Sequence, residues 1–565
     1  MVVLGIGATW RPASADQPPR SVVAARGGMV VSSHHEAARA GASILEKGGN
    51  AVDAAVATAF AVGVAQPFSA GVGGGAFALV RRPGGAIAAL DAREAAPSAA
   101  TSTMFVDPPV SEGASVLGPL AVAVPAFVPG MVELLEEHGT MSLARVLEPA
   151  IELAERGVEI GAYHTGMIGF MRSRLSSVRF AETWRIQFAP FDPANTQGQR
   201  LVQRDLGKTL RLLAAGGERV FRDGEVGRAI VAEVRLRGGI LTIDDMRSYE
   251  PVWREPVVAR YRGLRVISFP PPSSGGAVLA QALNVLEGFD LASLAPTDGA
   301  AVHLVTEAMK LAFADRAAYM GDSDFVDVPV DKLVSKAYAD RQRARIDTEK
   351  ATRMAAPGRL PEDSGTTHLS VTDAAGGAVA LTMTINTPFG SGITVPGTGV
   401  ILNNEMDDFA VAKDTPNSYG LVDTRGANLV AGGKRPLSSM TPTILERENE
   451  LFMVTGSPGG PRIISTTLLT ILNVVDWGMD PLQAVTAPRF HHQWDPDRVE
   501  VEPGMDASVV ESLAARGHEV LRSPRKWSAA EVIVVDPGTG MHLGGADPRT
   551  DGAAVGVDGV QTTLH

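Results

Sequence analysis

Two adjacent threonines and a histidine follow a short polar loop in the stretch PEDSGTTHLSVTD, which runs from Pro361 to Asp373. A threonine hydroxyl is a weak nucleophile unless a base removes its proton, and the α-amine of an N-terminal threonine can be that base. The pKa of an α-amine is about 8, which is close to working pH. A chain cut between Gly365 and Thr366 would therefore carry an activated nucleophile. From this stretch alone, an ordinary surface strand that begins at Thr366 is the favoured interpretation.

The elements around Thr366 are expected to hold it rigidly. Thr367, Leu369 and Val371 alternate with His368, Ser370 and Thr372, which is the period of a half-buried strand. A second strand is expected over residues 378–385, and Ala374-Ala375-Gly376-Gly377 supplies the turn of a hairpin. The preceding segment, 349–365, is polar, non-periodic and contains Pro and Gly, so we expect an exposed loop there.

The composition permits a large enzyme and excludes several function classes. The chain has 565 residues, 45% of them hydrophobic, so it can build a sizeable core. The absence of cysteine excludes disulfides, thiolate zinc sites and a cysteine nucleophile. The net charge of -12, without a polybasic run, argues against nucleic acid as a partner. The longest apolar stretch, near residues 54–65, is too short for a membrane span of about 20 residues.

The first 25 residues leave the compartment open. They contain a short apolar run and an Ala-Ser-Ala that is similar to a signal-peptidase site, but no basic n-region. We expect this segment to be disordered or a degenerate signal. The sequence is therefore compatible with a cytoplasmic or an exported protein.

The order of predicted elements is that of an α/β protein without internal repeats. Ser33 and Glu36 form a capping-box pattern for a helix that ends at Gly48-Gly49, and Asn50 is expected to cap a second, Ala-rich helix. A Gly-rich turn at residues 69–75 then leads into a buried strand. Residues 126–346 are predicted to be mostly helical, with 303–322 as the clearest amphipathic helix.

Longer motifs stand in order along the chain: GGNAVDAAVA, DAREAAP, PPPSSGG, TEAMKLAFADR, TTHLSV, NNEMDDF, KRPLSSM, GSPGG and APRFHHQW. In these motifs nearly the whole chain resembles the γ-glutamyltransferase (γ-glutamyl transpeptidase, glutathione hydrolase) family of N-terminal-nucleophile hydrolases. The resemblance implies a four-layer αββα sandwich, self-cleavage before Thr366 and no cofactor. It further implies a large subunit, 26–365, and a small catalytic subunit, 366–565, which remain associated as one αββα unit.

The implied substrates are γ-glutamyl amides such as glutathione, whose acyl group passes from Thr366 to water or to an amino-acid or peptide amine. A γ-glutamyl group carries an α-carboxylate and an α-ammonium, so its site needs both charges. The guanidinium of Arg93 matches a carboxylate. With the resemblance, the remaining assignments are Ser438 and Ser439 for the carboxylate, Glu405, Asp408 and Asn386 for the ammonium, Thr384 as partner of the nucleophile, Gly459 and Gly460 as oxyanion hole, and Tyr419 as the gating aromatic of a lid loop, 413–422.

Three alternatives remain open. An acylase for glutaryl or cephalosporin-type amides, or another small amidohydrolase, would use the same machinery. An uncleaved homologue that only binds ligands belongs to a different class, and the presence of the full catalytic set argues against it.

The segment HHQWDPD, 491–497, offers metal-ligand types, but adjacent histidines on an extended segment point to opposite faces, so no metal is expected.

Overall fold

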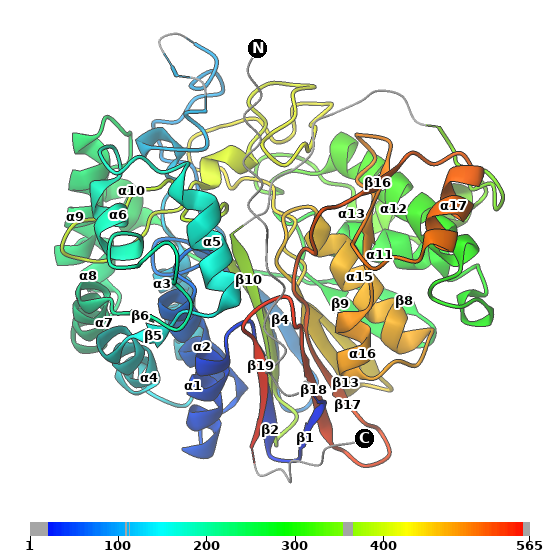
Figure 1. Cartoon of the computed structure of the whole chain (residues 1–565), viewed down its shortest axis with the longest axis horizontal. Helices are drawn as coiled ribbons and strands as arrows, with labels where there is room; N and C mark the ends of the chain where they lie inside the picture. The colour runs from blue at the N-terminus through cyan, green and yellow to red at the C-terminus, as the bar shows by residue number, and fades with distance from the viewer. Residues whose placement is uncertain (1–20, 108–109, 112, 354–364, 558–565) are drawn as a thin grey trace.

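The computed structural model describes residues 21–107, 110–111, 113–353 and 365–557. Most of the N-terminal segment and of the predicted loop before Thr366 lies outside these residues. Within them, two antiparallel seven-stranded sheets lie face to face, and helices cover both outer faces (Figure 1). The αββα sandwich expected from the sequence is confirmed. No helix of the described residues has the length and apolarity to cross a membrane.

Both sheets combine strands from distant parts of the chain. The first sheet has the order β1 (Val23–Ala25), β18 (His542–Ala546), β17 (Glu531–Val535), β13 (Glu450–Gly456), β12 (Thr443–Arg447), β9 (Leu264–Ser268) and β8 (Val257–Tyr261). The second has the order β19 (Ala553–Val557), β2 (Gly28–Ser32), β10 (Thr366–Asp373), β11 (Ala378–Thr384), β3 (Gly75–Arg81), β4 (Ile87–Ala92) and β7 (Val252–Arg254). Each sheet therefore combines strands from before and after residue 365.

The helices divide between the two outer faces (Figure 1). On the side of the second sheet lie α1 (His35–Glu46), α2 (Ala51–Ala65), α3 (Phe127–His138), α4 (Leu143–Arg156), α5 (Ala162–Arg172), α6 (Ala181–Gln187), α7 (Arg204–Gly216), α8 (Arg219–Arg222), α9 (Glu225–Leu236) and α10 (Ile243–Ser248). On the side of the first sheet lie α11 (Gly275–Leu286), α12 (Gly299–Tyr319), α13 (Val330–Leu333), α14 (Lys336–Arg343), α15 (Arg462–Val475), α16 (Pro481–Thr486) and α17 (Ala507–Ala515).

Strand β10 is buried on both faces, so the expectation of a half-buried strand was wrong. Leu369 and Val371 pack into the apolar core under the helices of the second sheet. The polar face packs against the first sheet, where Ser370 donates to the Glu531 carbonyl (3.0 Å) and Thr372 bonds to His542 (2.6 Å). The alternation was read correctly, but the polar side faces a second sheet instead of water.

The local predictions had mixed outcomes. The hairpin β10–β11 is confirmed, and Asn50 caps α2 with a full capping box. Ser33 does not cap α1; His34 does, because the Ser33 hydroxyl bonds to Gln66 and Thr367. The predicted amphipathic helix is α12, which is buried on nearly every side. The mostly helical region also contains strands β7–β9, which the helical pattern missed.

Candidate active site

The predicted site residues meet at one end of the two sheets. This end receives the start of β10, the end of β11, the end of β4 and the chain on either side of β12 and β13. A pocket there is lined by Arg93, Thr366, Thr384, Asn386, Glu405, Asp408, Tyr419, Leu421, Leu437, Ser438, Ser439, Met440, Gly460 and Ile463. Ten of the eleven predicted residues line it, and Gly459 adjoins it through Gly460. The apolar lining residues were not predicted.

Thr366 lies at the centre of a short hydrogen-bond chain. Its hydroxyl contacts the Thr384 hydroxyl at 3.0 Å, and Thr384 donates to the Gly365 carbonyl at 3.2 Å. Antiparallel pairing of β10 with β11 puts these two threonines opposite each other. The amide of Asn386 also donates to the Thr384 hydroxyl (2.8 Å), and the Gly365 amide donates to the Asn386 carbonyl (2.7 Å). The nucleophile candidate and the carbonyl before it are therefore both held in place.

The glycines at this end are required by space and by backbone conformation. A side chain on Gly365 would have its Cβ 2.7 Å from the Thr387 backbone and 2.8 Å from the Phe68 carbonyl oxygen. Gly459 and Gly460 follow β13 with φ angles of 132° and 57°, which L side chains rarely adopt. This turn brings the backbone at residues 459–460 to the pocket before α15 begins.

Arg93 pairs with the two acidic residues that were expected to bind the other end of the substrate. Its guanidinium bonds to Glu405 and to Asp408 and donates to the Pro436 carbonyl (3.1 Å). Burial alone would lower the pKa of Arg93, but the charges of Glu405, Asp408 and Glu94 outweigh burial and raise it. Burial raises the pKa of both Glu405 and Asp408, and Arg93 opposes that shift.

The charged end of the pocket holds more acid than base. Glu94, which adjoins Arg93 in the motif DAREAAP, is fully buried, and burial raises its pKa to about 7. Neither of its carboxylate oxygens, nor Oε2 of Glu405, has a hydrogen-bond partner among the described residues. Glu94 lies in the motif DAREAAP, but nothing in that motif distinguishes it from a surface glutamate.

The remaining predicted residues complete the walls. The Ser438 hydroxyl accepts from the Met440 amide (3.1 Å), which leaves its own hydrogen free to be donated into the pocket. The Tyr419 hydroxyl donates to Asn386, and the Tyr419 ring lies against the position that a Cβ on Gly460 would take (3.0 Å). Tyr419 thus closes the pocket over the 459–460 turn.

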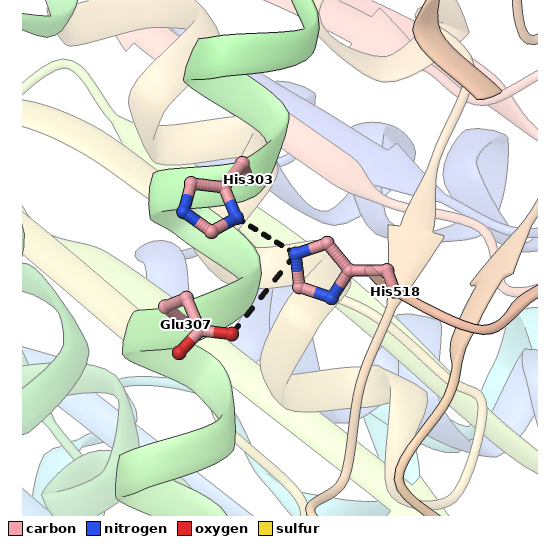
Figure 2. A group of neighbouring side chains, drawn as sticks. All are labelled: His303, Glu307 and His518. Atoms are coloured by element: carbon pink, nitrogen blue, oxygen red, sulfur yellow. Dashed lines mark hydrogen bonds and ion pairs between the residues drawn. The ribbon is translucent and has the colours of Figure 1, made fainter. Parts of the chain in front are cut away.

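A second cluster of metal-ligand types lies elsewhere, on α12 and the loop after α17 (Figure 2). Nδ1 of His303 and Nε2 of His518 bond directly at 2.7 Å, and His303 Nε2 bonds to the Asp347 carbonyl (2.8 Å). The Lys310 ammonium lies beside Glu307, at 2.9 Å. These contacts tie α12 to residues 347–352 and give His303, Glu307 and His518 partners within the protein.

The segment 491–497 contributes to packing near the same cluster. Both histidine side chains are buried; His491 bonds to Ser465 (2.9 Å) and Gln493 (3.0 Å), whereas His492 pairs with Asp497 at 3.2 Å. The two rings therefore have different neighbours, as their alternation along an extended segment predicts.

Comparison with known proteins places the whole chain. The family model for gamma-glutamyltranspeptidase matches residues 37–557. The chain is 40% identical over 562 residues to a glutathione hydrolase proenzyme of a Pseudomonas species, strain A14, covering 96% of both chains. It is 41% identical over 536 residues to the glutathione hydrolase proenzyme of Escherichia coli K12, covering 94% of this chain and 91% of that one.

Among solved structures, a cephalosporin acylase from Bacillus halodurans aligns with a TM-score of 0.85 at 31% identity. That alignment covers 98% of this chain and all of the acylase. The family match extends over nearly all of the described fold and includes every element that forms the pocket. The chain belongs to the gamma-glutamyltranspeptidase family.

Proposed function

We propose that this chain is a proenzyme that cleaves its own Gly365–Thr366 bond and then acts as a γ-glutamyltransferase and glutathione hydrolase. The observation that carries the proposal is the contact between the Thr366 hydroxyl, the Thr384 hydroxyl and the Gly365 carbonyl, in a pocket that Arg93 also lines. Relatives named glutathione hydrolase proenzyme, similar over nearly the full chain, support the same conclusion.

The direction of these hydrogen bonds supports self-cleavage. Because Thr384 donates its single hydrogen to the Gly365 carbonyl, Thr366 donates to Thr384. Attack of Thr366 Oγ1 on the Gly365 carbonyl carbon forms a C–O bond, and the peptide C–N bond then breaks as the nitrogen takes a proton. The Thr366 amine is set free in this step. Water then hydrolyses the resulting ester, which releases the Gly365 carboxylate and restores the Thr366 hydroxyl.

In the mature enzyme that amine is the base for the Thr366 hydroxyl. Attack on a γ-glutamyl amide forms an ester on Thr366 and expels the amine of the substrate. Backbone N–H groups at Gly459 and Gly460 are the proposed donors to the developing oxyanion. Water or an amino-acid amine then takes the acyl group, and Tyr419 limits access of water to the ester.

The charged end of the pocket suits a zwitterion. Arg93, Ser438 and Ser439 bind the α-carboxylate, while Glu405, Asp408 and Asn386 receive the α-ammonium. The zwitterionic end of the substrate adds no net charge to the pocket. As it replaces the ion pairs of Arg93 with Glu405 and Asp408, its carboxylate pairs with the guanidinium and its ammonium pairs with the carboxylates. An acyl group with a carboxylate alone adds negative charge to a site that already has an excess of acid.

Maturation provides the first test. Purified protein should give two chains on a denaturing gel, and the smaller should begin Thr366-Thr367-His368 in N-terminal sequencing. Thr366→Ala should leave one full-length chain without γ-glutamyl activity. Cleavage at another bond, or a fully active Thr366→Ala variant, would contradict the nucleophile assignment.

A glutaryl or cephalosporin acylase is the second candidate, since the structural neighbour with a TM-score of 0.85 is named a cephalosporin acylase. The two activities differ in the α-ammonium. We expect kcat/KM for a γ-glutamyl anilide to exceed that for the matching glutaryl anilide by at least ~10²-fold, because the glutaryl group leaves buried carboxylates unpaired. Comparable rates would favour the acylase.

Asp408→Asn tests the cause of that preference. The substitution removes charge and nearly preserves shape, so it should reduce the ratio chiefly by slowing the γ-glutamyl substrate. Asp407→Asn is a matched control: Asp407 bonds to Ser115 (2.9 Å) and Ser418 and does not line the pocket. If both variants change the ratio equally, the ammonium contact is not its source.

A further inference from the structure

Arg316 is a buried cation that the described chemistry has not yet used. It lies near the end of α12, is 5% exposed, and no ion pair joins it to a carboxylate among the described residues. It lines a hollow with Leu421 and Leu437, and these two residues also line the active-site pocket. Burying a guanidinium without a carboxylate partner costs free energy, so the presence of Arg316 beside this pocket needs an explanation.

Hydrogen bonds through Ser274 connect Arg316 with Ser438, a proposed substrate-binding residue. Its Nε donates to the Ser274 hydroxyl at 3.0 Å, and Ser274 donates from both its hydroxyl (2.8 Å) and its amide (2.9 Å) to the Ser438 carbonyl. Arginine Nε is only a donor, so the Ser274 oxygen must accept there. Its single hydrogen is therefore directed at Ser438.

The same guanidinium acts on the acidic side of the pocket. Its positive charge favours the ionised form of Asp408, in the same direction as Arg93 and against the effect of burial on the pKa of Asp408. Asp408 and Asp423 are in turn the charges that oppose the lowering of the Arg316 pKa by burial. Arg316 thus has an electrostatic link to the ammonium side and a hydrogen-bonded link to the carboxylate side.

We propose that Arg316 is a positioning residue that, through Ser274, fixes Ser438 for the α-carboxylate of the γ-glutamyl donor. The inference rests on the proposed function and extends it to a residue outside the pocket. Without the Arg316 bond, the Ser274 hydroxyl is free to rotate, and the clamp on the Ser438 backbone loosens. Binding of the carboxylate should then weaken more than the chemistry at Thr366.

The test compares two donors in four variants, one of which, Arg316→Lys, is a conservative rescue. The donors are γ-glutamyl-p-nitroanilide and 4-aminobutyryl-p-nitroanilide, which lacks the α-carboxylate and keeps an amine. Arg316→Met removes both the bond and the charge; Ser274→Ala removes only the link. Ser268→Ala is the control. Ser268 is also a buried serine, and its hydroxyl donates to the carbonyl of Pro442 (3.1 Å), which follows Ser438 in the same chain segment.

We expect Arg316→Met and Ser274→Ala to raise KM for the γ-glutamyl donor at least ~10-fold, with kcat and self-cleavage retained. Ser274→Ala should leave the 4-aminobutyryl donor nearly unchanged. Arg316→Met should raise KM for that donor less than for the γ-glutamyl donor, because the lost charge also acts on Asp408. Arg316→Lys, which keeps the charge and a donor, should recover part of the loss. Ser268→Ala should leave the ratio between donors as in the wild type.

The outcomes separate the inference from the proposed function. If wild-type enzyme shows no preference for the donor with the carboxylate, the proposed function fails and the inference fails with it. If the wild-type preference survives in Arg316→Met and Ser274→Ala, or if both donors lose activity equally, the inference alone is overturned. A loss that Ser268→Ala reproduces would also overturn it.

Discussion

Two of the buried clusters of charged side chains in the described residues differ in how their polar atoms are paired. In the cluster on α12, Lys310 donates to Glu307 (2.9 Å) and to the Thr352 carbonyl (2.7 Å), and it forms an ion pair with Asp497 (3.2 Å). In the pocket, Arg93 bonds to Glu405 and Asp408, yet Glu94 has no hydrogen-bond partner for either carboxylate oxygen among the described residues.

The difference is consistent with the proposed roles, a structural one for the cluster on α12 and ligand binding for the pocket. A buried acceptor without a partner costs about 1–3 kcal/mol, so a fold keeps several of them only where something else completes them. Charge and burial alone do not distinguish the two regions. Incomplete hydrogen bonding does distinguish them. Substitutions in the cluster on α12 should therefore change the free energy of unfolding, and those in the pocket should change kcat/KM.

The largest effect is expected in the complete cluster. Lys310→Met leaves Glu307 and Asp497 buried without their cation, which should lower the free energy of unfolding by ~3–5 kcal/mol. We expect little change in kcat/KM on a γ-glutamyl anilide. Urea unfolding in a Thr366→Ala background, where a single chain unfolds, measures the stability loss.

Adding Glu307→Gln to Lys310→Met is the control, because it removes the unpaired charge and should restore part of the stability. A Lys310→Met protein with wild-type stability and impaired catalysis would reverse the assignment of the two clusters.

The next effect is the converse one, in the incomplete cluster. Arg93→Lys keeps the charge but loses the planar, two-pronged geometry, so kcat/KM for γ-glutamyl substrates should fall ~10²-fold, as expected for losing a hydrogen bond of ~1.5–3 kcal/mol to a charged group. Self-cleavage, followed by gel, should proceed as in the wild type. Equal impairment of cleavage and turnover would indicate that Arg93 supports folding.

The smallest effect concerns His368, which lies two residues from the nucleophile but has complete hydrogen bonding, to Thr382 (2.8 Å) and Ser370 (3.2 Å). Burial lowers its pKa to about 3, so the folded protein keeps the ring neutral where the unfolded chain, with a pKa of about 6.5, takes up a proton. Its contribution to stability is complete above pH 6.5 and is lost as pH falls from there toward 3.

His368→Gln should therefore reduce the dependence of unfolding free energy on pH by ~1.4 kcal/mol per pH unit below 6.5. Urea midpoints at pH 7.0, 6.0 and 5.0, again in the Thr366→Ala background, give the slope. Parallel slopes for the two proteins would show that His368 does not remain neutral in the fold.

Much of the site could be predicted because its residues lie in motifs that resemble those of a known family, and for Thr366 and Arg93 the chemistry of the side chain gave a further reason. Thr366 and Thr384 belong to one hairpin, whose alternation and turn set their pairing. The burial of the polar face of β10 could not be predicted, since alternation does not say whether water or a second sheet lies opposite. Arg316 stands in a quoted motif, but its bond to Ser274 joins segments 42 residues apart and depends on tertiary packing.

The mixing within each sheet of strands from before and after residue 365 has a consequence for the stability of the mature enzyme. After a cut before Thr366, the described sheets would contain five pairings between two separate chains: β1 with β18, β12 with β9, β2 with β10 and with β19, and β11 with β3. The uncut chain assembles these pairings within one molecule, whereas the cut chains would have to find each other and interleave again. Refolding would then depend on concentration and compete with aggregation. After cleavage, the folded state would persist because it unfolds slowly, not because unfolded chains can refold.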